Sequence, residues 1–271
     1  ILQMGADSIS KLMQQKMGKD RWNIEEESFD QNKELVNTDT NINIPYLFRY
    51  KGKTNNGWMN INPFRGTMVI GTPGSGKSFG VINPAIRQMI AKGFCLCIYD
   101  FKFPELAQYV ESAYSNSDIA RYYFNFEDLK RSHRINPIAP ELMTKEAFAR
   151  EFAYTILVNL NPQMISKPDF WSDNATALLA STFWYLREKY PSYCTLPHAI
   201  SMILQPNFEA LLRELCSVPK CADMIAPIMT AYENKADEQL AGVISSLQVS
   251  LSKINIDELY YLMSESDFSL E

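Results

Sequence analysis

Eight consecutive residues, 71–78, constrain the fold of this chain more than any other part of its sequence. They run Gly-Thr-Pro-Gly-Ser-Gly-Lys-Ser and match the phosphate-loop pattern G-x-x-x-x-G-K-[ST] at every fixed position. The short apolar run 67–70 before them predicts a buried strand, and the residues from Phe79 onward predict a helix. A loop in this position offers a phosphate its backbone N–H groups and the positive end of the helix dipole. The sequence therefore predicts a site for a nucleoside triphosphate.

The residue types within the loop suggest separate roles. Lys77 is expected to reach the β- and γ-phosphate oxygens of ATP and to be the catalytic residue, and the Ser78 hydroxyl is expected to bind Mg²⁺. Asp100 ends a second apolar run, 94–100, and is a further candidate for Mg²⁺, with a purely structural role as the alternative. The candidate nucleotide-binding residues are Gly71, Thr72, Pro73, Gly74, Ser75, Gly76, Lys77, Ser78 and Phe79.

The composition limits the kinds of partner. The chain has 271 residues, 46% of them hydrophobic, which is enough for one large core or two smaller ones. Its net charge of −5 gives no overall field that attracts nucleic acid, so any DNA contact must come from a local patch or from partner subunits. The five cysteines and two histidines show no metal-binding spacing, and we interpret the cysteines as reduced thiols used as small apolar side chains.

The hydrophobic periodicity changes along the chain. Residues 1–40 form a polar leader with a helix expected near 8–17, and residues 41–140 carry strand signals. These include a hairpin from Ile42 to Ile61, whose turn is expected at Lys53–Gly57, and later strands at 94–100 and 121–126. From 141 to 255 the pattern predicts an all-helical subdomain, and 256–271 are expected to return to the nucleotide-binding domain. The helices of that subdomain are expected at 148–160, 171–190, 197–204, 208–215 and 240–251.

The ends of the sequence suggest an excised piece of a longer protein. The chain starts at Ile1 and stops at Glu271, directly after an apparent strand start, and it has no run of 18 apolar residues. The predicted fold class is α/β: the parallel sheet of a RecA-like P-loop NTPase, incomplete in this chain, with an inserted all-α subdomain.

Several short motifs, in their order along the chain, resemble those of the type IV coupling proteins, the TraG-like ATPases of conjugation. Besides the phosphate loop, they are Asn62 to Gly66, Asn83-Pro84, Tyr99 to Lys102, Ile135-Asn136-Pro137, Phe170-Trp171 and Ser266 to Leu270. The family commonly has Asp-Pro-Lys-Gly-Glu after its second strand, whereas this chain has Asp100-Phe101-Lys102-Phe103-Pro104-Glu105.

The resemblance implies a function. Such proteins are hexameric ATPases that are anchored at the cytoplasmic face of the bacterial inner membrane. They recruit relaxase-bound single-stranded DNA and pass it to the type IV secretion channel, and their helical subdomain is associated with substrate recognition. The acidic strand end that completes the Mg²⁺ site and the arginine finger are expected beyond Glu271. We therefore expect the excised fragment to be soluble, cytoplasmic, monomeric and inactive in turnover.

Two alternatives remain open at this stage. A P-loop kinase for a small molecule would use the same loop, but would need an arginine-rich lid, and the helical region has only Arg150, Arg187 and Arg213. A non-catalytic docking module would use the helical part to bind a relaxase or accessory protein.

Overall fold

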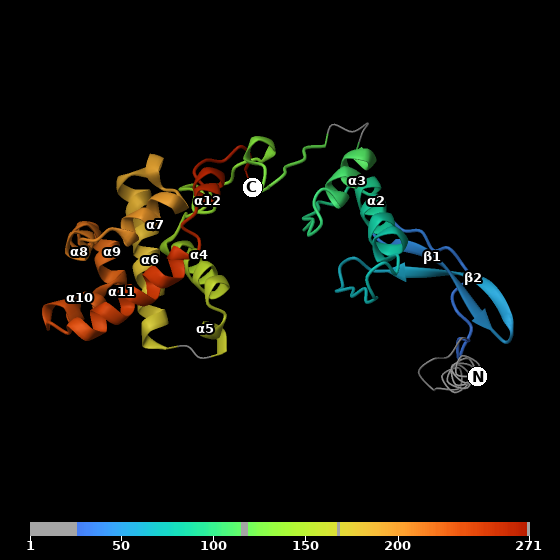
Figure 1. Cartoon of the computed structure of the whole chain (residues 1–271), viewed down its shortest axis with the longest axis horizontal. Helices are drawn as coiled ribbons and strands as arrows, with labels where there is room; N and C mark the ends of the chain where they lie inside the picture. Colours follow the sequence, from blue (N-terminus) through green and yellow to red (C-terminus); the bar gives the residue numbers. More distant parts are fainter. Residues whose placement is uncertain (1–25, 115–118, 167–168, 270–271) are drawn as a thin grey trace, which may run out of the picture. The chain divides into compact units, whose positions relative to one another are not determined.

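The computed structural model describes residues 26–114, 119–166 and 169–269. The chain divides into two compact units, residues 1–119 and 120–271, which are described separately below (Figure 1). The helix expected near 8–17 lies outside the described residues. The predicted domain boundaries after residues 40, 140 and 255 stay predictions.

A β-hairpin occupies the beginning of the first unit. Strand β1 (Ile42–Tyr50) pairs antiparallel with β2 (Lys53–Ile61) through a two-residue turn, Lys51–Gly52. Both turn residues have positive φ, 50° and 74°, which is the geometry of the type I′ turns that fit the twist of a hairpin. The prediction that Lys53–Gly57 form the turn was wrong, because these residues lie within β2.

The helix after the phosphate loop begins in an unusual way. A π-helical segment, η1 (Ser78–Ile82), leads directly into α2 (Asn83–Ala91), and the N–H of Asn83 donates to the carbonyl oxygen of Ser78. Pro84 has no N–H to donate, and it stands in the first turn of α2, where the wider π-type turn ends.

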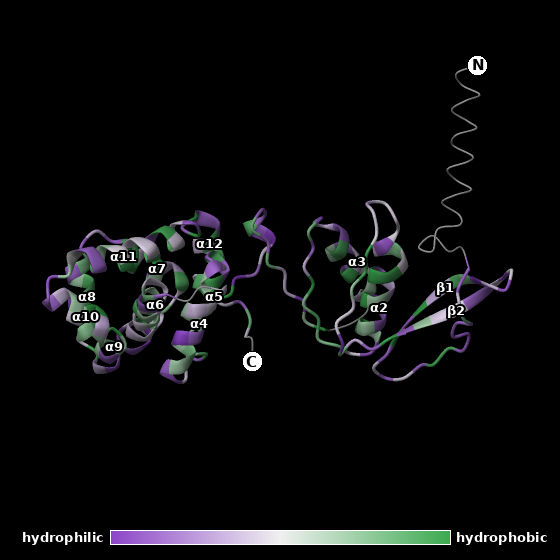
Figure 2. Cartoon of the chain, turned by 90° about the horizontal axis from the view of Figure 1, so that it is seen from below, coloured by the Kyte–Doolittle hydropathy of each residue, from purple (hydrophilic) through white to green (hydrophobic). Residues whose placement is uncertain are grey.

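Helix α3 (Glu105–Tyr114) packs with α2 around a small apolar core. Ile86, Val110 and Tyr114 are buried in it, and Ile98 packs against them. Hydrophobic residues, shown in green in Figure 2, follow both helices. Gln88 on α2 pairs with Asn43 of β1 as a neighbouring strand would: its amide nitrogen donates to the backbone carbonyl and its oxygen accepts from the backbone N–H, both at 2.9 Å.

The parallel sheet stays a prediction. Among the described residues, only β1 and β2 form a strand ladder, and the segments 67–70, 94–100 and 121–126 are not paired as strands. Along 94–101, exposure alternates: Ile98 lies against the small core, whereas Tyr99 and Phe101 are each 84% exposed. Cys95 and Cys97 lie on the exposed side, so these two free thiols do not serve as small apolar side chains of a core, as the sequence had suggested for all five.

The second unit is a bundle of helices around α6 (Phe170–Lys189). Every residue of α6 from Ala177 to Leu186 is buried, as expected for a helix covered on all sides. At its N-terminus, Asp169 accepts a hydrogen bond from the N–H of Ser172 at 2.7 Å, which caps the first turn. Around it lie α4 (Glu146–Leu160), α7 (Leu196–Leu204), α8 (Phe208–Cys216), α9 (Pro219–Met224), α10 (Ala226–Glu233) and α11 (Asp237–Ser252).

These elements confirm the helices predicted from periodicity, since α4, α6, α7, α8 and α11 coincide with them to within a few residues. Periodicity did not reveal the shorter elements, which have too few turns to establish a pattern. They are α9 and α10, together with α5 (Gln163–Ser166), α12 (Asp257–Leu262), η2 (Leu129–Arg131) and η3 (Pro191–Tyr193).

Trp171 marks a close approach of two helices. A Cβ atom at Gly242 on α11 would lie 2.7 Å from the Trp171 ring, so the ring covers this glycine. Phe170 contacts the Trp171 ring edge-on at 5.3 Å and is 48% exposed. Across the part of the chain that the structure describes, no helix combines the length and the apolar character needed to span a membrane.

Candidate nucleotide-binding site

The phosphate loop adopts a conformation that depends on its glycines. Gly74 and Gly76 have φ values of 77° and 81°, in the left-handed region that is costly for residues with a Cβ atom. Gly71 is needed for a different reason: a Cβ atom there would lie 2.5 Å from the Ser75 hydroxyl oxygen and 3.3 Å from the Lys77 side chain. The loop is therefore tightly folded: Gly71 leaves room for the Ser75 and Lys77 side chains, and Gly74 and Gly76 adopt the positive φ values that the turn requires.

Lys77 lies across this loop. Its Nζ donates to the carbonyl oxygens of Gly71 at 2.7 Å and Thr72 at 2.9 Å. These carbonyls hold the ammonium group beside the loop, half-buried between residues that are mostly exposed. A phosphate that entered the loop would exchange these two neutral acceptors for anionic oxygens, which form stronger hydrogen bonds.

The start of the helix adds a second contribution. Ser78 and Phe79 open the helical segment that continues through α2, and the N–H of Gly80 donates to the carbonyl oxygen of Gly76 at 2.7 Å. Helical N–H groups at this end carry partial positive charge, which favours an anion. The Ser78 hydroxyl is exposed beside Lys77, and Phe79 is 86% exposed.

Asp100 is placed at a helix terminus. Its Oδ2 atom accepts hydrogen bonds from the backbone N–H groups of Leu106 at 3.0 Å and Ala107 at 3.1 Å, within the first turn of α3. This is the geometry of a capping carboxylate, and it favours the structural alternative for Asp100. Its role toward Mg²⁺ stays a prediction.

The loop fits the group that its sequence predicts. Its glycine-lined turn, its lysine and its helix start are the components that hold the phosphates of a nucleotide. Mg²⁺ keeps several waters and takes oxygen ligands from the phosphates, and the exposed Ser78 offers one protein hydroxyl beside them. In the residues that the structure describes, no three His, Cys, Asp or Glu side chains gather as a metal-binding group.

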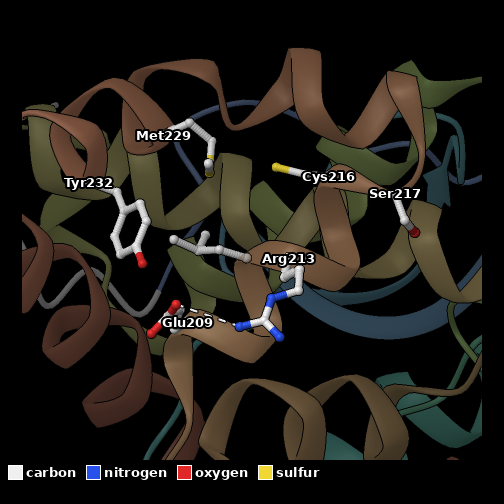
Figure 3. A pocket seen from close by; sticks show the side chains of 7 residues that line it. Glu209, Arg213, Cys216, Ser217, Met229 and Tyr232 are labelled. Carbon is white, nitrogen blue, oxygen red and sulfur yellow. Dashed lines mark ion pairs between the residues drawn. The ribbon is translucent and has the colours of Figure 1, made fainter.

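The second unit contains a cavity of about 380 Å³ between α8 and α10 (Figure 3). Leu212, Cys216 and Met229 supply its apolar wall, while Glu209 and Arg213 form an ion pair at 3.5 Å on its rim. The two charged side chains of the lining therefore sum to zero net charge. This cavity belongs to the helical unit, whereas the phosphate loop belongs to the first unit.

The structure also brings together two motifs that are far apart in the sequence. Residues 134–136 lie against residues 262–267, and Arg134 binds Asp267 through both its backbone and its side chain. Both motifs contribute to the family resemblance, but the sequence alone predicts no contact between them. No local pattern could have revealed a pairing across 133 positions.

Comparison with known proteins gives one result. Residues 13–271 match the protein-family model described as "Type IV secretory system Conjugative DNA transfer". No curated protein and no solved structure matches the chain.

Proposed function

This chain belongs to the type IV secretory system conjugative DNA transfer family, and on that premise we propose that it is part of a coupling ATPase. In this proposal, the intact protein recruits relaxase-bound single-stranded DNA at the cytoplasmic face of the inner membrane. It uses ATP hydrolysis to drive the DNA into the secretion channel, and it acts as a homo-hexamer. The observation that carries the proposal is the conformation of the phosphate loop. Lys77 Nζ is hydrogen-bonded to the carbonyl oxygen of Gly71, at a position where a Cβ atom would clash with Ser75.

The proposed mechanism assigns the residues of the first unit as follows. The backbone of the loop and Lys77 bind and orient the β- and γ-phosphates, which are the groups between which the bond breaks. The Ser78 hydroxyl would hold Mg²⁺, which would supply positive charge to neutralise the phosphate oxygens. Hydrolysis also needs an acid that orients the attacking water and an arginine that stabilises the transition state, and we assign neither role to a residue of this chain.

The structure gives less support to a small-molecule kinase. Such an enzyme needs arginines that converge on the phosphate acceptor. Arg187 on α6 instead pairs with Glu188 and lies over the Trp184 ring, at 4.5 Å from its centroid. Arg213 on α8 pairs with Glu209.

Nucleotide binding is the first test of the proposal. The 271-residue chain is titrated with a fluorescent ATP analogue in the presence of Mg²⁺, and Lys77→Ala is compared with Lys53→Ala on the exposed edge of the hairpin. Loss of hydrogen bonds from a charged donor should raise the Kd of the Lys77 variant by about tenfold to a hundredfold. The Lys53 variant should bind like the unchanged chain.

The second test concerns turnover. In the intact protein, ATP hydrolysis should rise with single-stranded DNA, and Lys77→Ala should abolish both hydrolysis and DNA transfer. A Lys77→Ala protein that retains normal turnover would refute the role assigned to this lysine.

A further inference from the structure

Backbone hydrogen bonds join three chain segments of the second unit. The N–H of His133 donates to the carbonyl oxygen of Tyr123 at 2.7 Å. The N–H of Ile135 donates to the carbonyl oxygen of Leu262 at 2.8 Å, and the N–H of Asp267 donates to the carbonyl oxygen of Arg134 at 3.0 Å. The segment that leads into the helices is therefore hydrogen-bonded to the segment that leaves them. We call residues 121–136 and 262–268 the clasp.

Arg134 makes most of the polar contacts that join residues 132–136 to residues 262–268. Its Nη2 donates to Asp267 Oδ1 at 2.8 Å, its Nε donates to Asp267 Oδ2 at 3.3 Å, and its backbone N–H donates to the same Oδ2 at 2.7 Å. A further ion pair joins Arg134 to Glu265 at 2.7 Å. A forked arginine–carboxylate contact of this kind fixes geometry as well as supplying energy.

Aromatic rings also join the two segments of the clasp. Tyr122 and Phe268 stack with their centroids 4.0 Å apart and their planes 12° apart, and His133 meets the Tyr122 ring edge-on at 5.3 Å. The two segments thus hold each other through backbone, charged and aromatic contacts at once.

Asn136 connects the clasp to the helical core. Its backbone N–H donates to the Ser266 hydroxyl at 3.0 Å, and its side-chain amide donates to the carbonyl oxygen of Cys194 at 2.7 Å. Cys194 and Ile138 are fully buried, and the Cys194 thiol lies 3.3 Å from the Ile138 carbonyl oxygen. Asn136 therefore joins both segments of the clasp to the packed core.

We infer that Arg134 and Asp267 are positioning residues that make the segment entering the helical unit and the segment leaving it move as one body, and that DNA transfer by the intact protein requires this connection. The polypeptide that follows the phosphate loop reaches the helices through residues 121–136. Because the clasp binds this segment to residues 262–268, movement of the first displaces both ends of the helical unit together. The functional part of this inference depends on the proposed ATPase function, but the existence of the clasp does not.

The variants that test the clasp are Arg134→Ala, Asp267→Ala and the charge-swapped pair Arg134→Asp with Asp267→Arg. Arg131→Ala is the matched control, since Arg131 lies three residues away and forms an ion pair with Asp128 while its side chain is 86% exposed. Hydrogen exchange of the 271-residue chain, followed by mass spectrometry, measures whether residues 262–268 have come loose. ATP affinity is measured on the same chain, and DNA transfer is measured with the intact protein.

The single variants at Arg134 and Asp267 should exchange their 262–268 amides about tenfold faster, as expected for the loss of a charge-assisted hydrogen-bond pair. ATP affinity should stay within about twofold, whereas DNA transfer should fall by about tenfold, a size typical of coupling between sites. The charge-swapped pair should recover part of both losses, and Arg131→Ala should change neither.

Three results would overturn the inference. Unchanged exchange at 262–268 would show that the clasp does not hold these residues. A loss of ATP affinity equal to the loss of transfer would make Arg134 part of the nucleotide site. Full DNA transfer with an open clasp would remove its coupling role. Failure of the ATPase proposal is recognised separately, because Lys77→Ala would then leave transfer intact while the exchange measurement still tests the clasp.

Discussion

The replacement Asn136→Ala tests how firmly the clasp is attached to the helical core. Asn136 is 7% exposed, and its side chain both donates to the carbonyl oxygen of Cys194 and accepts from the N–H of Ile138, at 2.7 and 3.2 Å. Alanine removes both hydrogen bonds. The carbonyl oxygen of Cys194 and the N–H of Ile138 then lose the side-chain partner that Asn136 provides. Each loss at a buried position costs about 1–2 kcal/mol, so the free energy of unfolding should fall by about 3 kcal/mol.

The assay is thermal and urea unfolding of the 271-residue chain, followed by the helical circular dichroism signal. For a unit of this size, about 3 kcal/mol corresponds to a decrease of about 6–12 °C in Tm. Asn159→Ala is the control, because Asn159 on α4 also makes a side-chain hydrogen bond, to Thr155 at 2.7 Å, but is exposed. It should change stability by less than about 0.5 kcal/mol. Equal effects of the two variants, or no effect of Asn136→Ala, would refute the reasoning.

Two further predictions concern α6. Hydrogen bonding from Ser172 lowers the pKa of Asp169 from its ordinary value of 3.8, so this cap stabilises the fold above that pH and loses its effect as pH falls through the lowered pKa. Asp169→Ala should lower the free energy of unfolding by about 1 kcal/mol at pH 7. In urea titrations, the difference in this free energy between the variant and the unchanged chain should shrink below pH 3.8. A difference that stays constant with pH would contradict this prediction. Tyr185→Phe removes the part-buried hydrogen bond to Glu214 Oε2 at 2.7 Å and should cost about 1.5–3 kcal/mol in the same assay. Tyr154→Phe on the exposed face of α4 should be neutral, and a loss of the same size there would count against this account.

The sequence predicted those features whose signals are local. The spacing of apolar residues located α4 and α6, and the fixed positions of the phosphate-loop pattern located Lys77. The turn at Lys51–Gly52 was missed because a lysine with positive φ gives no compositional signal, whereas the Asn-Asn-Gly that follows resembles a turn.

The remaining misses concern distant contacts. A continuous apolar run such as 94–100 predicts a strand buried on both faces, but which segment pairs with it depends on residues far away in the chain. Asp100 was singled out as the polar end of that run, and only the structure shows it bound to the first turn of α3. The pairing of Arg134 with Asp267 has no local signal at all.

The alternating exposure of residues 94–101 has a practical consequence for handling the protein. Tyr99 and Phe101 in this segment are exposed, and among the described residues no strand ladder pairs with it. The unpaired backbone groups of such a segment can form a strand ladder with another molecule. Short apolar segments without charge or proline are also those that stack into aggregates. Residues 94–99, Phe-Cys-Leu-Cys-Ile-Tyr, have that composition, and two of their side chains are exposed thiols that oxidation can cross-link. Concentrated preparations of this chain therefore call for a reducing agent, and the first place to look for self-association is this segment.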